Sequence, residues 1–389
     1  MKLLKDILYK VNIVSVIGST DLNFNKIEFN SRSISKNDLF VAIKGNDLDG
    51  NFYIPQAIDN GAKIILCESS PKIIVKGISY VIIKDSRQSL AIISSNFYNN
   101  PSSKLKLIGI TGTNGKTTTS TLMHQLFMLL NNKVGLISIN KILINKKVLQ
   151  STHTTPDPLN LNRILSMMVE EGVEYCFMEV SSHAIDQHRI YGLNFDIGLF
   201  TNLSHDHLDY HKSFKEYRDV KKAFINSLSK NSFAIINADD KNGAYMTQNT
   251  KAKVYKYALK SSSDFSLKIL EKDFNGMKLL INGHEVWSKL IGEFNAYNIL
   301  ATYSLAKIFE YSDELILNKI SSLISADGRF ERILQNNNKN IGIIDYAHSP
   351  DSVQKILETL NELKNKEESL ITVIGCGGDR DKAKRPLMG

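Results

Sequence analysis

The 389-residue sequence has few cysteines and no long hydrophobic run. Its three cysteines, Cys67, Cys176 and Cys376, are widely separated, which argues against both a disulfide framework and a zinc site. No uninterrupted apolar stretch approaches the ~18 residues that a membrane-spanning helix needs. Residues 1–14 carry charged side chains among their apolar ones, a pattern that predicts an amphipathic helix rather than a signal peptide. These absences favour a protein of the reducing cytoplasm with no membrane insertion.

A dense block of basic residues is also missing, although the formal net charge is +8. The lysines are dispersed among glutamates and asparagines, without the interleaved aromatic residues that nucleic-acid-binding surfaces show. A small, phosphate-rich substrate accounts for local positive charge equally well. Nucleic acid is therefore not an expected partner.

The most informative segment is LIGITGTNGKTTTS, residues 107–120, in which a Gly-rich turn follows an apolar run. Glycines let backbone N–H groups approach phosphate oxygens, Lys116 can reach the terminal phosphates, and the hydroxyl of Thr117 can ligate Mg²⁺. The spacing departs from the usual G-x-x-x-x-G-K pattern because position 110 is Ile. The segment predicts a variant nucleotide-phosphate loop; the alternative is an ordinary strand-to-helix turn with a surface lysine.

The apolar runs predict an α/β protein with three domains. Short apolar runs at 38–44, 62–67 and 79–84 indicate a small domain over residues 1–100. It ends at the turn-forming segment Asn-Asn-Pro-Ser-Ser, residues 99–103. Over 101–330, strand-like runs alternate with helical stretches, as in a mainly parallel sheet covered by helices. Residues 331–389 begin a strand-helix-strand series. Because a domain typically has about 100–150 residues, this third domain is expected to be incomplete.

Two polar segments follow strand-like runs and are candidate metal sites. Glu179 ends the run EYCFMEV, at the strand edge where the phosphate loop is expected to open, and a carboxylate there suits Mg²⁺. The alternative is a solvated carboxylate at a strand end. In FTNLSHDHLDYH, residues 200–211, three histidines suggest zinc, but no cysteine lies nearby to complete a structural zinc site.

A third candidate lies in FKEYRDVKKAFINSL, a predicted amphipathic helix. Phe214, Tyr217, Val220 and Phe224 form one apolar stripe, and Lys221 lies on the same face, so Lys221 is expected to point inward and Lys222 away. A lysine on a buried face usually extends its ammonium group to solvent, which is the alternative. If it is buried beside another cation, its pKa falls, and the neutral amine can react with CO₂.

The string TGTNGKTT resembles the ATP loop of the Mur ligases and of the related folylpolyglutamate synthetases. The resemblance to Mur ligases extends to TNLSHDHLDYH and to the Tyr-x-x-x-Lys pattern that ends at Lys221. It also covers the segments 30–50, 292–298, 328–331 and 345–352. This resemblance implies a small N-terminal α/β domain, a central P-loop domain with a mainly parallel sheet, and a Rossmann-like C-terminal domain.

The same resemblance implies the residues that bind the nucleotide and its metals. Two Mg²⁺ ions would be held by Thr117, Glu179, His207 and Lys221, the last as a carbamate (N6-carboxylysine) formed with CO₂. Lys116, Lys221, His207 and Glu179 would be the catalytic residues. The expected ATP contacts are Gly112, Thr113, Asn114, Gly115, Lys116, Thr117, Thr118, Asn295, Asn298, Arg329, Asp345 and His348. Helix capping is the alternative role for the two later asparagines.

For the other substrates, the resemblance is to the Mur ligases that add the third residue of the peptide. It implies contacts to a UDP-muramyl dipeptide from Ser31, Asn46, Asp47, Leu48, Asp49, Thr154, Thr155, Ser181, Gln187 and Arg189. Arg380, in GCGGDRD, would bind the incoming amino acid. Taken singly these motifs are weak, because Thr-Thr-Pro is usually a turn and Ser-Ser-His usually a loop or cap.

The implied reaction is ATP-dependent amide formation between UDP-MurNAc-L-Ala-D-Glu and a diamino acid, through an acyl phosphate, in peptidoglycan precursor synthesis. The resemblance favours meso-diaminopimelate over L-lysine, but the motif that decides between them is expected beyond residue 389. Two alternatives remain open. One is another Mur-type ligase or a folylpolyglutamate synthetase, and the other is a regulatory P-loop ATPase or nucleic-acid-binding switch.

Overall fold

The computed structural model describes residues 1–45, 49–151, 153–207, 210–334, 340–376 and 384–389. Their contacts form two compact units. The first consists of Met1–Leu105, Pro156–Glu171 and His183–Asn194, and the second of Lys106–Thr155, Gly172–Ser182 and Phe195–Gly389. The domain boundaries at 100 and 330 remain sequence-based predictions, because this division follows other segments. Within the described ranges, no helix is both long enough and apolar enough to cross a bilayer.

The first unit is built on a five-stranded sheet with the order β2-β7-β6-β5-β4. Strands β4 to β7 run parallel, and β2 pairs antiparallel with β7 at one edge. The strand bounds are β2 Ile13–Ile17, β4 Ile27–Glu28, β5 Asp38–Val41, β6 Ala62–Cys67 and β7 Ser79–Ile83, with a separate antiparallel pair of β1 Lys2–Leu3 and β3 Asn23–Phe24. The helices are α1 Leu4–Ile7, α2 Ile54–Asp59, α3 Ser86–Phe97 and α5 Pro158–Glu170, and the 3-10 turns are η1 Ser31–Ser33, η2 Gly50–Tyr53 and η3 Pro101–Ser103.

Both faces of this sheet are buried, which explains why its strands are continuous apolar runs. Leu39 and Val41 of β5 face a core shared with residues of α1 and α3. Phe40 and Ala42, the alternating positions, face a second core that includes residues of α2. Because successive side chains of a strand point to opposite faces, the side chains of each apolar run alternate between two separate cores.

The second unit contains an eleven-stranded sheet with the order β11-β10-β9-β12-β8-β13-β14-β15-β16-β17-β18. Its centre is parallel, and antiparallel hairpins extend both edges. The bounds are β8 Lys106–Thr111, β9 Val134–Ile137, β10 Lys141–Ile144, β11 Lys147–Gln150, β12 Tyr175–Glu179, β13 Ile197–Phe200, β14 Phe233–Asn237, β15 Lys253–Ala258, β16 Phe265–Asp273, β17 Gly276–Ile281 and β18 His284–Ser288. The sheet extends from β8 in both directions, so β8 lies at the switch point where open α/β sheets bind ligands.

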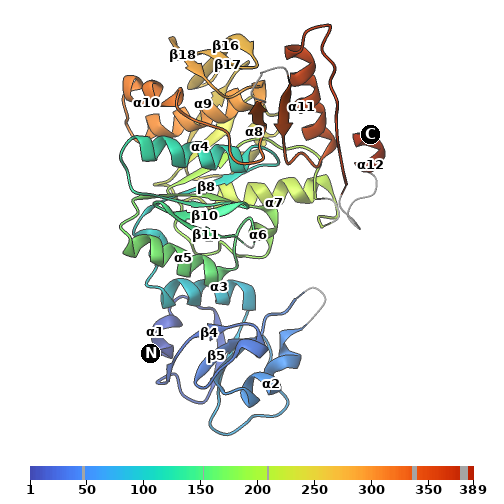
Figure 1. Cartoon of the computed structure of the whole chain (residues 1–389). Coiled ribbons are helices and arrows are strands. Elements are labelled where there is room, and N and C mark those ends of the chain that lie inside the picture. The colour runs from blue at the N-terminus through green and yellow to red at the C-terminus, as the bar shows by residue number, and fades with distance from the viewer. Residues whose placement is uncertain (46–48, 152, 208–209, 335–339, 377–383) are drawn as a thin grey trace. The chain divides into compact units, whose positions relative to one another are not determined.

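Helices cover both faces of this sheet. Figure 1 shows α4 (Lys116–Leu129) and α9 (Glu293–Ile308) side by side, and both share one hydrophobic core with the strands. On the opposite face lies α7 (Phe214–Ser227), because a Cβ added to Gly109 of β8 would lie 2.5 Å from the Phe224 ring. The shorter helices of this unit are α8 Gly243–Met246 and α10 Asp313–Ile320, whereas α6 Ser182–Asp186 belongs mostly to the first unit.

The rest of the second unit comprises β19 (Glu331–Leu334), β20 (Ile341–Ile344), α11 (Pro350–Leu363) and α12 (Lys384–Met388). β19 and β20 form an antiparallel pair. The second strand expected in this region is not formed: residues 369–376 are irregular and exposed, with Val373 95% accessible. Among the described residues no sheet edge pairs with this segment, and an apolar run becomes a strand only where a neighbour accepts its hydrogen bonds.

The predicted N-terminal amphipathic helix is also wrong in most of its length. Residues 1–14 contain β1, the single turn α1 and the start of β2. Leu4 and Ile7 of α1 are buried, as an amphipathic turn requires, but Ile13 and Ser15 pair with β7 in the sheet instead of continuing the helix. The β-branched run that follows Val11 favours a strand once β7 offers an edge.

Candidate nucleotide-binding site

The predicted phosphate loop joins β8, in the middle of the sheet, to the N-terminus of α4. Gly112 and Gly115 have φ values of +146° and +85°, which L side chains rarely adopt. A Cβ on Gly112 would lie 1.9 Å from Thr201 Oγ1, and one on Gly115 would lie 2.7 Å from Asn298 Oδ1. Both positions therefore need glycine for conformation and for space.

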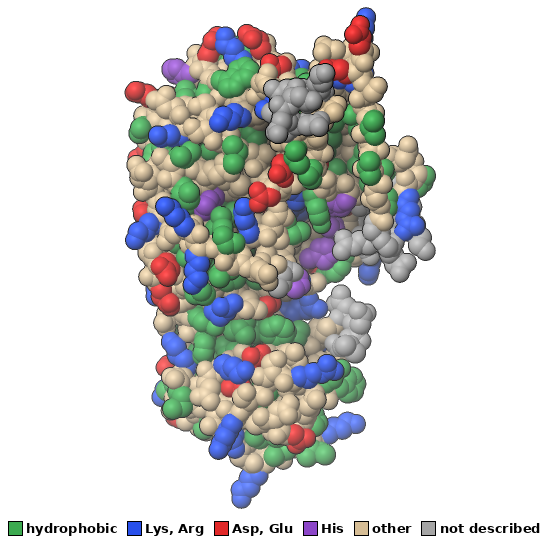
Figure 2. Space-filling model, in the orientation of Figure 1, with side chains coloured by type: hydrophobic (Ala, Val, Ile, Leu, Met, Phe, Trp, Pro, Cys, Tyr) green, Lys and Arg blue, Asp and Glu red, His purple; other side chains and the backbone are tan. Residues whose placement is uncertain are grey.

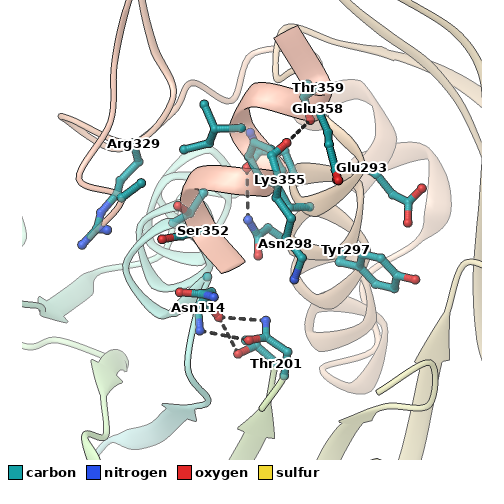
Figure 3. Close-up of a pocket in the computed structure, with 18 of the residues that line it drawn as sticks. Asn114, Thr201, Glu293, Tyr297, Asn298, Arg329, Ser352, Lys355, Glu358 and Thr359 are labelled. Carbon is teal, nitrogen blue, oxygen red and sulfur yellow. Dashed lines mark hydrogen bonds between the residues drawn. The ribbon is translucent and has the colours of Figure 1, made fainter. Parts of the chain in front are cut away.

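The loop is held by residues that follow β13. Thr113 N–H donates to the Asn202 carbonyl (2.8 Å), and Asn114 N–H donates to Asn202 Oδ1 (3.0 Å). In return, the Asn114 carbonyl accepts from Thr201 Oγ1 (2.7 Å; Figure 3) and from Asn202 Nδ2 (3.0 Å). The first N–H groups of α4, which have no partner within a helix, are then the ones available to bind an anion.

Two lysine ammonium groups meet at one carbonyl of this loop. Lys116 Nζ donates to the carbonyl oxygens of Gly112 (2.9 Å) and Thr113 (2.7 Å), and Lys221 Nζ donates to that of Gly112 (2.8 Å). Lys221 is only 1% exposed, so it points inward as its helical spacing indicated. Burial and, next, the charge of Lys116 hold the pKa of Lys221 well below its ordinary value. Burial also lowers the pKa of Lys116.

Lys222 does not point into solvent as expected. It is 9% exposed, and its Nζ lies 3.8 Å from the centroid of the Tyr245 ring and donates to Gln248 Oε1 (2.9 Å). The reason is that α8 and the residues after it pack against this side of α7, which a helical period alone does not reveal.

Glu179 lies at the end of β12 and is 1% exposed. Its carboxylate accepts from Ile139 N–H (3.0 Å), and burial raises its pKa against the opposing effects of Lys116 and Arg329. Thr117 Oγ1 accepts from the Arg329 guanidinium (3.1 Å). The Thr117 hydroxyl and the Glu179 carboxylate are the hard oxygen donors that Mg²⁺ prefers, so this part of the predicted donor set fits the metal.

His207, the next predicted metal ligand, lies beside Asp206 and Tyr217. Its backbone has φ of 55°, its Nε2 lies 3.4 Å from Asp206 Oδ2, and its ring is 6.1 Å from the Tyr217 ring. In the part of the chain that the structure describes, no three His, Cys, Asp or Glu side chains are grouped to hold a metal ion. His211 is almost fully buried against Tyr217, with ring centroids 5.3 Å apart, while His205 is exposed.

Beside the loop is a cavity of about 560 Å³, a volume typical of small-molecule sites. One side is formed by the loop and α9, and another by α11, whose Ser352, Lys355 and Glu358 are labelled in Figure 3. The cavity collects residues that are distant in sequence. Eight of the predicted ATP contacts line it: Asn114, Gly115, Thr118, Asn295, Asn298, Arg329, Asp345 and His348.

Asn295 and Asn298 do not cap α9, whose N-cap residue is Gly292. Asn298 Oδ1 accepts from Thr119 Oγ1 (3.0 Å), and its Nδ2 donates to Asn295 Oδ1 (3.0 Å). These two amides therefore connect α9 to α4. Nearer α11, Asp345 accepts from two backbone N–H groups, and burial raises its pKa.

The cavity also contains residues that were not predicted. Asp239, just after β14, accepts from the backbone N–H groups of residues 259–261 and from Tyr297 Oη (2.8 Å), and these hydrogen bonds lower its pKa to about 2. Asp351 of α11, which does not line the cavity, accepts from Asn114 Nδ2 (2.9 Å) in the phosphate loop. A signal for Asp239 existed in the sequence, because NADD directly follows a strand-like run. Asp351 carried no comparable signal.

The residues predicted to bind the UDP-muramyl dipeptide are distributed over both units. In the first unit, Ser31 Oγ donates to Gln56 Oε1 (2.7 Å), Asp49 caps η2, and Gln187 Oε1 accepts from Arg189 (2.7 Å). In the second, half-buried Thr154 precedes Thr155, which donates to the Glu179 carbonyl (2.8 Å) and accepts from Ser181 N–H (3.2 Å). Four predicted residues lie outside the described residues: Asn46, Asp47, Leu48 and Arg380.

The surface charge is mixed. On the face that Figure 2 shows, Lys and Arg side chains are interspersed with Asp and Glu side chains, and the described residues form no continuous basic stripe there.

The N-terminus of α4 faces a cavity of nucleotide size, and a buried lysine lies across the loop before it. This arrangement defines a nucleotide-binding protein of the P-loop class.

Comparison with known proteins identifies the family. The model for the Mur ligase middle domain matches residues 110–306, that for the Mur ligase family catalytic domain matches 23–101, and that for the Mur ligase glutamate ligase domain matches 328–389. The chain is 48% identical to the UDP-N-acetylmuramoyl-L-alanyl-D-glutamate–2,6-diaminopimelate ligase of Cytophaga hutchinsonii, over 99% of this chain and 79% of that protein. The enzyme of the same name from Bacteroides fragilis is 45% identical over the same shares.

Two solved structures have a fold similar to that of this chain. A ligase of that name has a TM-score of 0.78 and 27% identity, covering 100% of this chain and 79% of that one. MurF from Acinetobacter baumannii, at 18% identity, shares the fold with a TM-score of 0.66 over 93% of this chain and 76% of that one. The chain belongs to the Mur ligase family, and it is an ATP-dependent, amide-forming ligase.

Proposed function

We propose that this chain joins 2,6-diaminopimelate to UDP-N-acetylmuramoyl-L-alanyl-D-glutamate, using ATP, in peptidoglycan precursor synthesis. The 48% identity to a ligase of that name over 99% of the chain carries the proposal. The geometry supports the ATP-dependent part, because Lys116, Thr117 and Glu179 lie together at the N-terminus of α4. The reaction is assigned to the cytoplasm, where ATP is available.

Two bond-forming steps make up the reaction. The D-glutamate side-chain carboxylate attacks the γ-phosphorus of ATP, the bond to ADP breaks, and an acyl phosphate forms. The diamino acid's amine then attacks the acyl carbon, phosphate leaves, and the nitrogen loses a proton to give the amide. The N–H groups at the start of α4 and the Lys116 ammonium neutralise the charge that develops on the phosphate oxygens.

Mg²⁺, when bound, adds further neutralisation of that charge. Thr117, Glu179 and His207 are the proposed protein ligands. Asn295, Asn298, Arg329, Asp345 and His348 are proposed to face the nucleotide, since all five line the cavity beside the loop. The UDP-muramyl dipeptide contacts and Arg380 remain proposals that rest on the sequence resemblance.

Lys221 is proposed to act as a carbamate. Its neutral amine attacks CO₂, an N–C bond forms, and a proton is lost, which leaves an anionic carboxylate able to bind Mg²⁺. Three observations support this: the side chain is buried, its pKa is lowered by burial and by Lys116, and its nitrogen is directed at the phosphate loop.

Carbamylation can be tested with ¹³C-bicarbonate and NMR. Wild type is expected to show a carbamate carbon signal that Lys221→Ala loses, and Lys222→Ala, which removes the neighbouring lysine, is expected to keep it. Short-chain carboxylic acids are expected to restore part of the activity of Lys221→Ala. A signal of equal size in Lys221→Ala would refute this role.

The activity itself can be tested by supplying ATP, UDP-N-acetylmuramoyl-L-alanyl-D-glutamate and either meso-diaminopimelate or L-lysine, and detecting the product by mass spectrometry. We expect amide formation with meso-diaminopimelate. Lys116→Ala should abolish ATP-dependent turnover while it leaves binding of the UDP-linked substrate largely intact. Equal loss of turnover and of that binding would contradict the division of roles.

A further inference from the structure

Tyr217 is a fully buried residue of α7 that lies one helical turn before Lys221. Its hydroxyl and its ring contact different parts of the site. The hydroxyl reaches the phosphate loop, and the ring lies against the side chain of Lys221 and the rings of two histidines.

The hydroxyl contact joins α7 to the phosphate loop. Tyr217 Oη lies 3.1 Å from Thr113 Oγ1. Thr113 Oγ1 already accepts from Ser204 N–H (3.0 Å) and donates its own proton to the Ser204 carbonyl (3.3 Å). The positions of the two oxygens allow either one to donate; while Thr113 gives its one proton to Ser204, the phenol proton of Tyr217 is available to Thr113. Burial raises the pKa of the Tyr217 phenol, so it keeps this proton at any working pH.

The ring contact concerns the lysine. Lys221 Nζ lies 4.8 Å from the centroid of the Tyr217 ring and 2.8 Å from the Gly112 carbonyl. Gly112 and Thr113 are adjacent in the loop. Tyr217 therefore contacts Thr113 directly, and it contacts Lys221, which in turn donates to Gly112. Both contacts connect α7 to the phosphate loop.

We propose that Tyr217 is a positioning residue that fixes the position of the Lys221 side chain relative to the phosphate loop. Its hydroxyl fixes Thr113, and its ring restricts the long side chain of Lys221 so that the nitrogen stays at the Gly112 carbonyl. The consequence for turnover rests on the proposed function. The consequence for nucleotide binding does not.

Two substitutions separate these contacts. Tyr217→Phe removes the hydroxyl and keeps the ring, and Tyr217→Leu removes both. Tyr245→Phe is a matched control, because Tyr245 also packs against α7 but its hydroxyl donates to Asp219 (2.8 Å), which is not part of the candidate site. The readouts on the full chain are ATP and ADP affinity by calorimetry, the ¹³C-carbamate signal as a function of bicarbonate concentration, and urea unfolding.

Tyr217→Phe is expected to weaken ATP binding about 3- to 10-fold, the effect of one lost buried hydrogen bond, with an unchanged carbamate titration. Tyr217→Leu is expected to weaken ATP binding at least as much and to raise the bicarbonate concentration at half-signal about threefold or more, because the lysine regains rotameric freedom. Tyr245→Phe should change neither quantity.

ATP affinity of Tyr217→Phe within twofold of wild type would overturn the hydroxyl's role. Identical carbamate titrations for Tyr217→Phe and Tyr217→Leu would overturn the ring's role. A purely structural residue would lower stability in urea and leave both readouts of the folded protein unchanged. If wild type forms no amide, the proposed function fails, but the comparison of ATP affinities still decides whether Tyr217 positions the loop.

Discussion

Replacing Gly112 by alanine tests whether the phosphate loop needs both the conformation and the space that glycine provides. Gly112 has φ of +146°, and an added Cβ would lie 1.9 Å from Thr201 Oγ1. That hydroxyl cannot move away without a cost, because it donates to the Asn114 carbonyl (2.7 Å) and lies 3.3 Å from the Thr111 carbonyl. Relief of the clash therefore disturbs the loop itself.

The energetic cost of Gly112→Ala has two contributions. An L residue in this backbone conformation costs about 1–3 kcal/mol, and disrupting the Thr201 hydrogen bonds costs about 0.5–1.5 kcal/mol each. A cost of about 3 kcal/mol carried by the loop corresponds to a loss of nucleotide affinity of about 100-fold or more. We expect the effect mainly in binding, because a loop can rearrange locally without unfolding the sheet.

Calorimetric titration with ATP and ADP, together with urea unfolding, measures these effects. Gly283→Ala is the matched control: Gly283 has φ of +88° in the turn between β17 and β18, with open space around its added Cβ. It should lose about 1 kcal/mol of stability and no nucleotide affinity. Gly112→Ala/Thr201→Ala should recover part of the affinity. If Gly112→Ala binds ATP within twofold of wild type, the reasoning is refuted.

Three further predictions concern residues around the cavity. The pKa of Asp239 is lowered from 3.8 to about 2, so its carboxylate stabilises the fold above its ordinary pKa and the effect is lost as pH falls through about 2. After allowance for its partial exposure, Asp239→Asn should lower the free energy of unfolding by about 1 kcal/mol at neutral pH, and urea midpoints should converge with wild type below about pH 4. Arg329→Lys removes the hydrogen bond to Thr117 (3.1 Å) and the contact with the Tyr346 ring, so kcat/KM for ATP should fall about 10-fold. An unchanged kcat/KM would show that the guanidinium is dispensable. Asn298→Ala removes the amide that bridges α9 and α4 and should lower the free energy of unfolding in urea by about 1–3 kcal/mol; an unchanged value would show that this bridge does not stabilise the fold.

Local pattern was sufficient for the parts of the fold that depend on nearest neighbours. The strand of residues 107–111, the glycine loop and the helix that begins at Lys116 occur where the sequence indicated. The inward direction of Lys221 followed from a helical period of about 3.6. The helix expected over residues 1–14 and the strand expected over 369–376 were wrong, because their conformation depends on which sheet edges are present.

The sequence by itself determined the phosphate-loop motif that ends at Lys116, because its glycines, lysine and hydroxyl lie in one short segment. That motif predicts a nucleotide-phosphate site, and the other motifs indicated the ligase family. Only the tertiary structure decided that the Nζ atoms of Lys116 and Lys221 meet at one carbonyl. It alone also revealed Asp239 and Asp351 beside the nucleotide loop. These contacts depend on the order of strands in the sheet and on the packing of α7 and α11, which join distant segments and leave no periodic signal in the sequence.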